Sequence, residues 1–326
     1  MKKLLALTLC LLTVIPMALV GCGNNNANAA VKFGAGEYIS TPVVADATED
    51  KDGSAKLDVT YAAVLVDADG KIVACDLDTA SNTVNFTADG KAVANESFKT
   101  KYEFGNDYNM VAYGGAVKEW FEQADAFEAV VAGKTLDEVK ALVADANKGT
   151  EEVINAGCTI MVNEFVGAIE KAYSAAAVEV KADSVLKVRM ATEQTLADAT
   201  EEKDGNNKIA VNLFAAATDA DGKVVAASSD CAEVTFTFDM AGASTFDTTK
   251  EVVTKKNQGE NYGMVAYGGA EKEWFEQAAA FDAACIGKTA SEIAGLAGED
   301  GNGAADLQAA GCTIYVTGFV KAASKI

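Results

Sequence analysis

The first regular feature of the chain is a pair of largely apolar runs that predicts a β-hairpin. In "KLDVTYAAVLVDADGKIVACDLD", residues 56–78, two β-rich runs flank an Asp-Gly pair. Such runs are typical of strands, and Asp-Gly favours the tight turn of a hairpin. The segment "TVNFTADGK" at 83–91 predicts a further strand. This part of the chain is therefore expected to form an antiparallel sheet.

The spacing of apolar residues then changes to that of helices. A stripe at i, i+4, i+7 and i+11 is formed by Trp120, Ala124, Phe127 and Val131. This stripe predicts a helix that starts near Ala116 and ends at Gly133. Thr135 with Glu138 three residues later is a capping box and predicts a second helix. A last helix is expected from near Asn163, which would be its N-cap, with a counterpart from near Thr317. Strands followed by helices indicate an α+β domain whose antiparallel sheet is covered on one face.

The second half of the chain repeats the first. "DATEDKDG" at 46–53 returns as "DATEEKDG" at 198–205, and 23 of the 35 residues at 105–139 recur at 259–293. Self-similarity of this length indicates a duplication. We therefore expect two tandem homologous domains, 36–173 and 185–326, joined by a linker at 174–184. Each is expected to be an antiparallel sheet packed with about three helices.

The N-terminus has the pattern of an export signal. Lys2 and Lys3 precede an apolar run at 4–20, which is shorter than a typical transmembrane helix. "LVGC" at 19–22 resembles the bacterial lipobox. The resemblance implies a signal peptide at 1–21, lipidation of Cys22, and an anchored, flexible tether at 22–35 on the outer face of the cell membrane. An ordinary secretory signal cut elsewhere is the alternative.

Composition excludes several classes of function. The chain has 27 basic and 48 acidic residues and a net charge of −21, which argues against nucleic acid as a partner. It has no histidine, which excludes Ser-His-Asp and Cys-His catalysis and histidine-containing zinc sites. Any chemistry must then come from carboxylates, Lys, Tyr, Cys or a bound cofactor.

Cysteines and acidic turns do not predict a metal site. None of the seven cysteines forms a C-x-x-C pair. Cys231 and Cys285 occur only in the second copy, where they could pair as a disulfide or remain as thiols; the place of Cys285 on the helical stripe favours a buried thiol. The "DADG" stretches lack the alternating ligands of a calcium loop, so hairpin turns are the preferred interpretation.

The helix with the tryptophan carries recurring polar residues. Trp120 and Trp274 are best explained as core residues. The polar identities at Lys118, Glu119, Glu122, Gln123 and Lys134 all return in the second copy. A Tyr-Gly-Gly stretch precedes each helix. Its glycines would let a ligand approach the backbone, and a helix N-terminus would offer free N–H groups to an anion.

The sequence "AGCT" stands before the last helix of each copy, at 156–159 and 310–313. Small residues there would present Thr159 and Thr313 on a tight turn. The turn follows a "DADGKI" hairpin and a helix that ends in "GKT". This order resembles the FMN-binding domain of exported bacterial proteins and of the flavin-carrying subunits of sodium-pumping quinone reductases.

In that family the pattern is roughly Asp-x-x-Ser-Gly-Ala-Thr, and the threonine hydroxyl carries FMN through a phosphodiester bond. This chain has Ala156 and Ala310 in place of the serine and Cys158 and Cys312 in place of the alanine. The aspartate six residues before the threonine is missing. Covalent FMN, non-covalent flavin and a descendant that binds no flavin therefore remain as three alternatives.

The resemblance implies a flavin-dependent electron carrier at the cell surface, rather than an enzyme with its own substrate. Its partners would be a flavin transferase and a quinone-linked donor in the membrane. The alternative is a surface ligand-binding or structural lipoprotein that has lost flavin binding. The implied cofactor-binding residues are Thr159, Thr313, Gly157, Gly311, Tyr113, Tyr267, Gly115, Gly269, Lys118 and Lys272.

Overall fold

The computed structural model describes residues 29–326, which form a mixed α+β structure with two antiparallel sheets. The first sheet has the order β5-β4-β3-β1-β6, with β2 paired to β3, and the second has the order β7-β8-β9. The strands of the first sheet are β1 (Ala30–Ile39), β2 (Val43–Ala45), β3 (Gly53–Val66), β4 (Ile72–Phe86), β5 (Ala92–Val93) and β6 (Val178–Lys181). Those of the second are β7 (Val185–Ala197), β8 (Gly205–Thr218) and β9 (Val224–Phe238).

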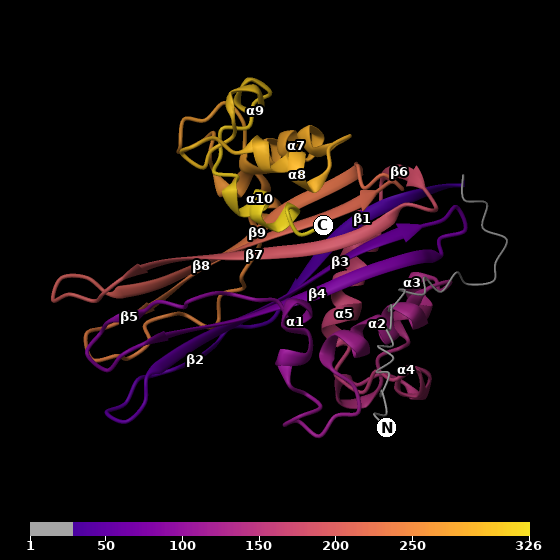
Figure 1. Cartoon of the computed structure of the whole chain (residues 1–326). Helices are drawn as coiled ribbons and strands as arrows, with labels where there is room; N and C mark the ends of the chain where they lie inside the picture. The colour runs from indigo at the N-terminus through magenta and orange to yellow at the C-terminus, as the bar shows by residue number, and fades with distance from the viewer. Residues whose placement is uncertain (1–28) are drawn as a thin grey trace, which may run out of the picture.

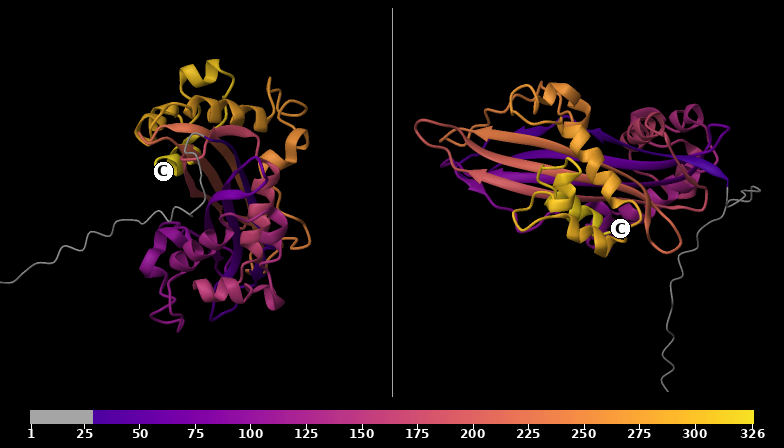
Figure 2. Two further views of the ribbon diagram at one scale, coloured as in Figure 1. Left: turned by 90° about the vertical axis from the view of Figure 1, so that its right-hand side faces the viewer. Right: turned by 90° about the horizontal axis from the view of Figure 1, so that it is seen from above.

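Helices cover the outer face of each sheet, so the molecule is layered as helices, sheet, sheet, helices (Figures 1 and 2). The first set is α1 (Lys101–Phe104), α2 (Trp120–Val131), α3 (Leu136–Lys140), α4 (Glu151–Ala156) and α5 (Asn163–Ser174). The second is α6 (Lys255–Gln258), α7 (Trp274–Cys285), α8 (Ala290–Ile293), α9 (Ala305–Ala309) and α10 (Thr317–Ala323). Each half has more than the three helices expected, because short helices form before and after the long one.

The hairpin predicted around Asp-Gly is confirmed as β3 and β4. Asp67 closes its turn, since one carboxylate oxygen accepts the N–H groups of Asp69 and Lys71. Asp219 does the same in the second half, so these carboxylates are used in turns. The separate strand predicted at 83–91 is wrong: β4 continues unbroken to Phe86, and the residues after it form a turn.

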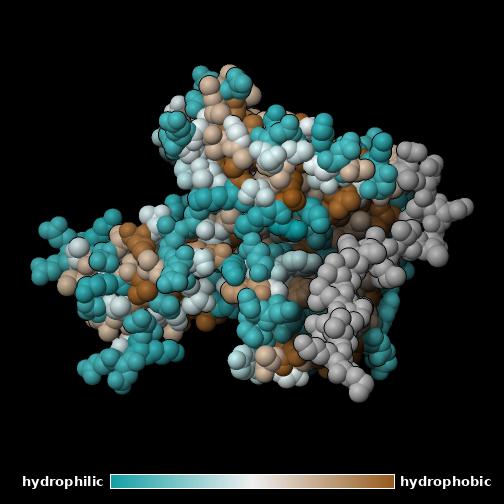
Figure 3. Space-filling view, in the orientation of Figure 1, coloured by the Kyte–Doolittle hydropathy of each residue, from teal (hydrophilic) through white to brown (hydrophobic). Residues whose placement is uncertain are grey.

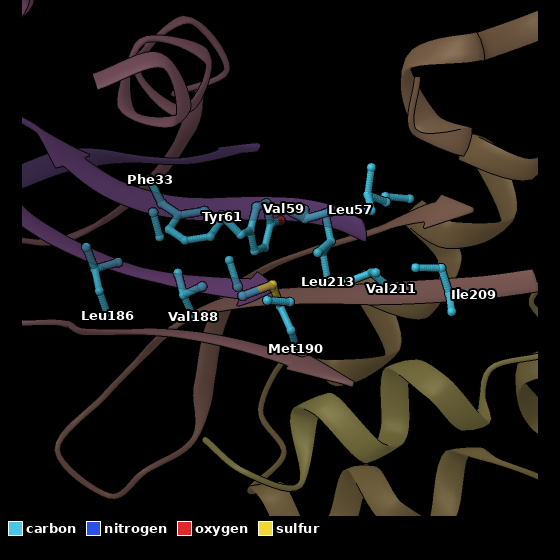
Figure 4. Packing of buried hydrophobic residues seen from close by; sticks show 14 of the residues in the cluster. Phe33, Leu57, Val59, Tyr61, Leu186, Val188, Met190, Ile209, Val211 and Leu213 are labelled. Carbon is cyan, nitrogen blue, oxygen red and sulfur yellow. The ribbon is translucent and has the colours of Figure 1, made fainter. Parts of the chain in front are cut away.

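The two sheets pack face to face and share one hydrophobic core (Figure 4). Leu57, Val59 and Tyr61 of β3 lie in the same cluster as Val188 of β7 and Val211 of β8. Stacking two apolar faces removes both from water, and this burial is the main stabilising term of such a sandwich. The inner face of each sheet is therefore covered by the other half of the chain.

Part of the expected tether and linker belongs to the first sheet. Residues 30–35 lie in β1, and β6 occupies 178–181 and pairs with β1. The physical reason is burial: Val31, Phe33 and Val180 all join the shared core. The signal peptide at 1–21, Cys22 and the tether up to residue 28 lie outside the described residues. Within residues 29–326, no helix is long and apolar enough to cross a membrane.

Each helical layer has its own core beneath it. The predicted stripe of α2 is confirmed, because its four members are all buried against the first sheet. The helix begins at Trp120 and not near Ala116, since the preceding residues form turns. The capping box of Thr135 and Glu138 and the start of α5 at Asn163 are confirmed, although Val162 and not Asn163 is the N-cap.

The far ends of the hairpins exchange matching contacts. Ala47 N–H donates to Gly242 O at 2.8 Å, and Ala199 N–H, at the repeated position, donates to Gly90 O at 2.8 Å. Between them Phe86 and Phe238 stack with ring centroids 4.6 Å apart. Reciprocal contacts of this kind are typical of a twofold interface. Hydrophilic residues cover most of the projecting hairpin ends on the left of Figure 3.

Candidate functional site: two exposed threonine turns

Each AGCT sequence forms a left-handed turn at the end of a short helix. Gly157 follows α4 with φ 106°, a conformation that favours glycine, and Gly311 follows α9 with φ 93°. The turn buries Cys158 completely and leaves the next residue, Thr159, exposed. The predicted presentation of the threonine beside a glycine is therefore what the structure has in both halves.

A buried glutamine holds each threonine. Gln123 Oε1 accepts both the backbone N–H of Thr159, at 2.8 Å, and its hydroxyl, at 3.0 Å. Gln277 Oε1 makes the same two contacts with Thr313 at the same distances. Gln123 is only 1% exposed, and its amide donates to Lys118 O, so the acceptor is fixed in place. Sequence reasoning noted that this glutamine recurs but did not assign it a role.

A lysine lies over each turn. Lys118 Nζ is 3.4 Å from Ala156 O, and Lys272 Nζ is 3.3 Å from Ala310 O. A Cβ added to Gly157 would lie 2.3 Å from Lys118 Nζ, so glycine makes room for this lysine. The predicted residues Lys118, Gly157 and Thr159 are thus brought together. Lys134 instead pairs with Glu152 at 2.9 Å.

The N-terminus of α2 is not free to bind an anion. The carboxylate of Glu119 lies there, is 5% exposed, and accepts the N–H groups of Met110 and Val111. Glu273 does the same for Met264 and Val265. The expectation of a helix start at Gly115 or Gly269 is therefore wrong, because both glycines lie in the loop that the glutamate holds.

The tyrosines of the two loops project into solvent. Tyr113 is 88% exposed and Tyr267 is 92% exposed. The same loop and turn expose further apolar side chains, Val111, Val117 and Met161. An aromatic ring that packs on nothing is available for stacking with a ligand.

The turn fits the phosphate end of FMN better than its ring. Thr159 is an exposed residue whose hydroxyl donates to Gln123 Oε1, and the ammonium group of Lys118 lies over the same turn, 3.4 Å from Ala156 O. For the ring, the turn offers exposed side chains; a cavity of about 920 Å³ in the described structure lies elsewhere, between β1 and β9. The residues therefore fit a surface-held, covalently attached flavin better than one that depends on a closed pocket.

The cysteines beside the threonines are unreactive in this fold. Burial raises the pKa of Cys158 and of Cys312 to about 11, so both remain protonated at neutral pH. All five cysteines of the described chain are free, and Cys231 and Cys285 are separate buried thiols. In residues 29–326, no three acidic or cysteine side chains gather in an arrangement that could hold a metal ion.

Comparison with known proteins adds no further assignment. The chain matches no protein-family model, no curated protein and no solved structure.

Proposed function

We propose that the protein is an extracytoplasmic, lipid-anchored carrier that holds one flavin mononucleotide at each AGCT turn. The observation that carries this proposal is the repetition of one arrangement: an exposed threonine, whose hydroxyl donates to a buried glutamine, beside a lysine. FMN, when bound, supplies one- and two-electron redox chemistry.

The roles of the protein residues follow from their positions. Gln123 and Gln277 orient the threonine hydroxyls, and Lys118 and Lys272 would offset the charge of the phosphodiester. The exposure of Thr159 and Thr313 would give a flavin transferase access to both. An electron donor in the membrane, linked to quinone, is the proposed partner.

The two turns would work as independent sites. They lie on opposite outer faces of the molecule (Figure 1). Helices are about 10 Å across and packed sheets about 10 Å apart, so the turns are separated by on the order of 30 Å. Direct transfer between two flavins is therefore disfavoured, and each flavin would exchange electrons with an external partner.

We further propose that the halves are homologous copies of one domain. The repeated sequence and the reciprocal contacts of the hairpin ends support the duplication of a single domain that formed a homodimer before it was duplicated. The domain boundaries in this proposal are the repeated segments, with β1 and β6 included in the first copy.

Site-directed variants test the two attachment points. The protein is produced with a flavin transferase, and its intact mass is measured after denaturation. We expect Thr159→Ala and Thr313→Ala each to lose one FMN mass, the double variant to lose both, and the control Thr48→Ala, at a surface turn, to lose none. Flavin that remains on the denatured double variant would contradict the assignment. An unmodified wild-type protein that also fails to bind added FMN would favour a surface ligand-binding lipoprotein.

A further inference from the structure

A cavity of about 920 Å³ opens along one edge of the sandwich, between β1 of the first half and β9 of the second. Helices α5 and α6 complete its walls. The volume is in the range of small-molecule sites. Its lining includes Phe33, Gly36, Glu37, Tyr38, Tyr61, Lys171, Ser228, Asp230, Lys256 and Asn257. It lies apart from both AGCT turns.

The opposite edge of the sandwich is closed by side chains. There Asp76 of β4 accepts the N–H of Val188 of β7 at 2.5 Å. Arg189 lies 3.9 Å from the same carboxylate, donates to Lys325 O at 2.9 Å, and lies over the ring of Tyr102. One arginine and one aspartate thus join the two sheets along this edge.

The open edge lacks both of these residues. Gly36 of β1 pairs with Ala62 of β3, and Arg189 of β7 pairs with Phe214 of β8. Phe214 is the repeated position of Ala62. The first half therefore has Gly36 where the second half has Arg189. Ser228 stands at the repeated position of Asp76. A Cβ on Gly36 would lie 2.3 Å from the backbone of Ala172, because α5 packs directly on this strand. The contacts that cross this edge are different: Asn257 Nδ2 donates to Glu37 Oε1 at 2.5 Å, and Tyr61 OH donates to Ser228 O at 3.1 Å. The cavity lies among these residues.

A buried carboxylate faces the cavity from β1. Glu37 is 5% exposed, and its Oε1 atom accepts from Asn257 Nδ2 at 2.5 Å and lies 3.6 Å from Lys171 Nζ. Both contacts use Oε1, so a ligand ammonium group would pair with Oε2. Burial, with a contribution from the nearby Asp230, raises the pKa of Glu37 to about 7. A positive charge placed next to Glu37 would favour the ionised form of this buried carboxylate.

Aromatic residues line the same cavity. Phe33 and Tyr61 are 2% and 1% exposed, and Tyr38 is half-buried. They give the cavity an apolar wall beside the carboxylate, against which the hydrocarbon part of a ligand can pack. The net charge of −21 also draws cations and repels anions.

We propose that this cavity binds a small organic cation, in which an ammonium group pairs with Glu37 and an apolar body lies against the aromatic residues. Lys171 is the internal competitor, because its ammonium group already lies near the same carboxylate. Lys171 and Lys256 at the rim would instead favour a carboxylate ligand, and the experiment separates these two possibilities.

The test compares two probes of similar size and opposite charge. Binding of phenethylamine and of phenylacetate to the full mature protein is measured by calorimetry at pH 8. We expect phenethylamine to bind more tightly. Preference for phenylacetate, or no binding of phenethylamine at millimolar concentration, would overturn the proposal.

Two variants change the affinity in opposite directions. Glu37→Gln should weaken phenethylamine binding by at least tenfold, whereas Lys171→Met should strengthen it because the competing cation is removed. Glu202→Gln, at a distant surface turn, is the matched control and should bind like the wild type. Thermal unfolding checks that each variant is folded. Unchanged binding in Glu37→Gln, or weaker binding in Lys171→Met, would contradict the proposal.

The pH dependence of phenethylamine binding gives an independent measure of the contact with Glu37. The ligand ion is expected to displace the proton from Glu37, so affinity should rise between pH 6 and 8. The charged or titratable groups that face Glu37 are Tyr38, Tyr61, Glu170, Lys171, Asp230 and Lys256. Affinity that is flat over this range in the wild type would contradict the role of Glu37. None of these results depends on whether flavin is attached.

Discussion

Two buried polar residues, Glu119 at the N-cap of α2 and Gln123 within it, have partners that explain their own recurrence in the second half. Glu119 holds the preceding loop, and Gln123 holds the AGCT turn. Neither belongs to a solvated helix face, since both are at most 5% exposed. Recurrence of polar identities beside a buried tryptophan was the signal in the sequence. It could not reveal the partners, because these lie up to 36 residues away.

Removing the glutamine should destabilise each half equally. Gln123→Ala removes the acceptor of the N–H and hydroxyl of Thr159, and each lost hydrogen bond costs about 0.5–1.5 kcal/mol of unfolding free energy. Gln277→Ala removes the same contacts and should cost a similar amount. Urea unfolding measures both. A loss below about 0.5 kcal/mol in both variants would mean that the turn does not depend on the glutamine.

Buried carboxylates should make the protein more stable at mildly acidic pH. Burial raises the pKa of Asp78 to about 7 and that of Asp282 to about 6, above ordinary values near 4. The folded state therefore binds more protons than the unfolded state in this window, and stability falls as pH rises from about 4 to 7. We expect a higher Tm at pH 5 than at pH 8, and a smaller difference in Asp78→Asn. A Tm that is equal or higher at pH 8 would contradict this expectation.

At the level of elements, local sequence patterns predicted most of the long strands and helices. The hairpin, the stripe of α2 and the capping box of α3 are set by neighbours along the chain, so the sequence reveals them. The start of α2 and the end of β4 were misplaced. Both depend on tertiary contacts, since Glu119 holds the loop before α2 and Phe86 is fixed by its stack on Phe238.

The contact of α5 with β1 requires glycine. A Cβ on Gly34 would lie 2.2 Å from Ala172 O, with no flexible side chain to move aside. Gly34→Val should therefore lower the unfolding free energy by about 1–3 kcal/mol, as overpacking does. Gly295→Ala is the control, because nothing lies within 4 Å of its added Cβ and its φ is not in the left-handed region. Equal Tm values for the two variants would contradict the close approach of α5.

At the level of the whole molecule, the face-to-face packing was not predicted. The apolar run "YAAVLV" at 61–66 does not alternate, and its residues are buried on both faces of β3. Such a run indicates two-sided burial. The sequence could not show which sheet covers the second face of β3. A sheet from the same chain and a sheet from another chain would produce the same apolar pattern.

Separate halves should therefore not be stable monomers. Residues 29–182 alone would expose the sheet face that carries Leu57, Val59 and Tyr61. We expect this fragment to dimerise through that face or to aggregate, and sedimentation velocity distinguishes these states from a monomer. Residues 183–326 should behave in the same way. A folded, monodisperse monomer of either fragment would show that the shared core is dispensable.

The proposed function is tested most directly by the mass and visible spectrum of the mature wild-type protein, made with a flavin transferase. We predict a flavin spectrum and two added FMN masses, both of which survive denaturation. Colour that is lost on denaturation would contradict covalent attachment at Thr159 and Thr313. A colourless protein of unmodified mass would contradict flavin carriage at these turns.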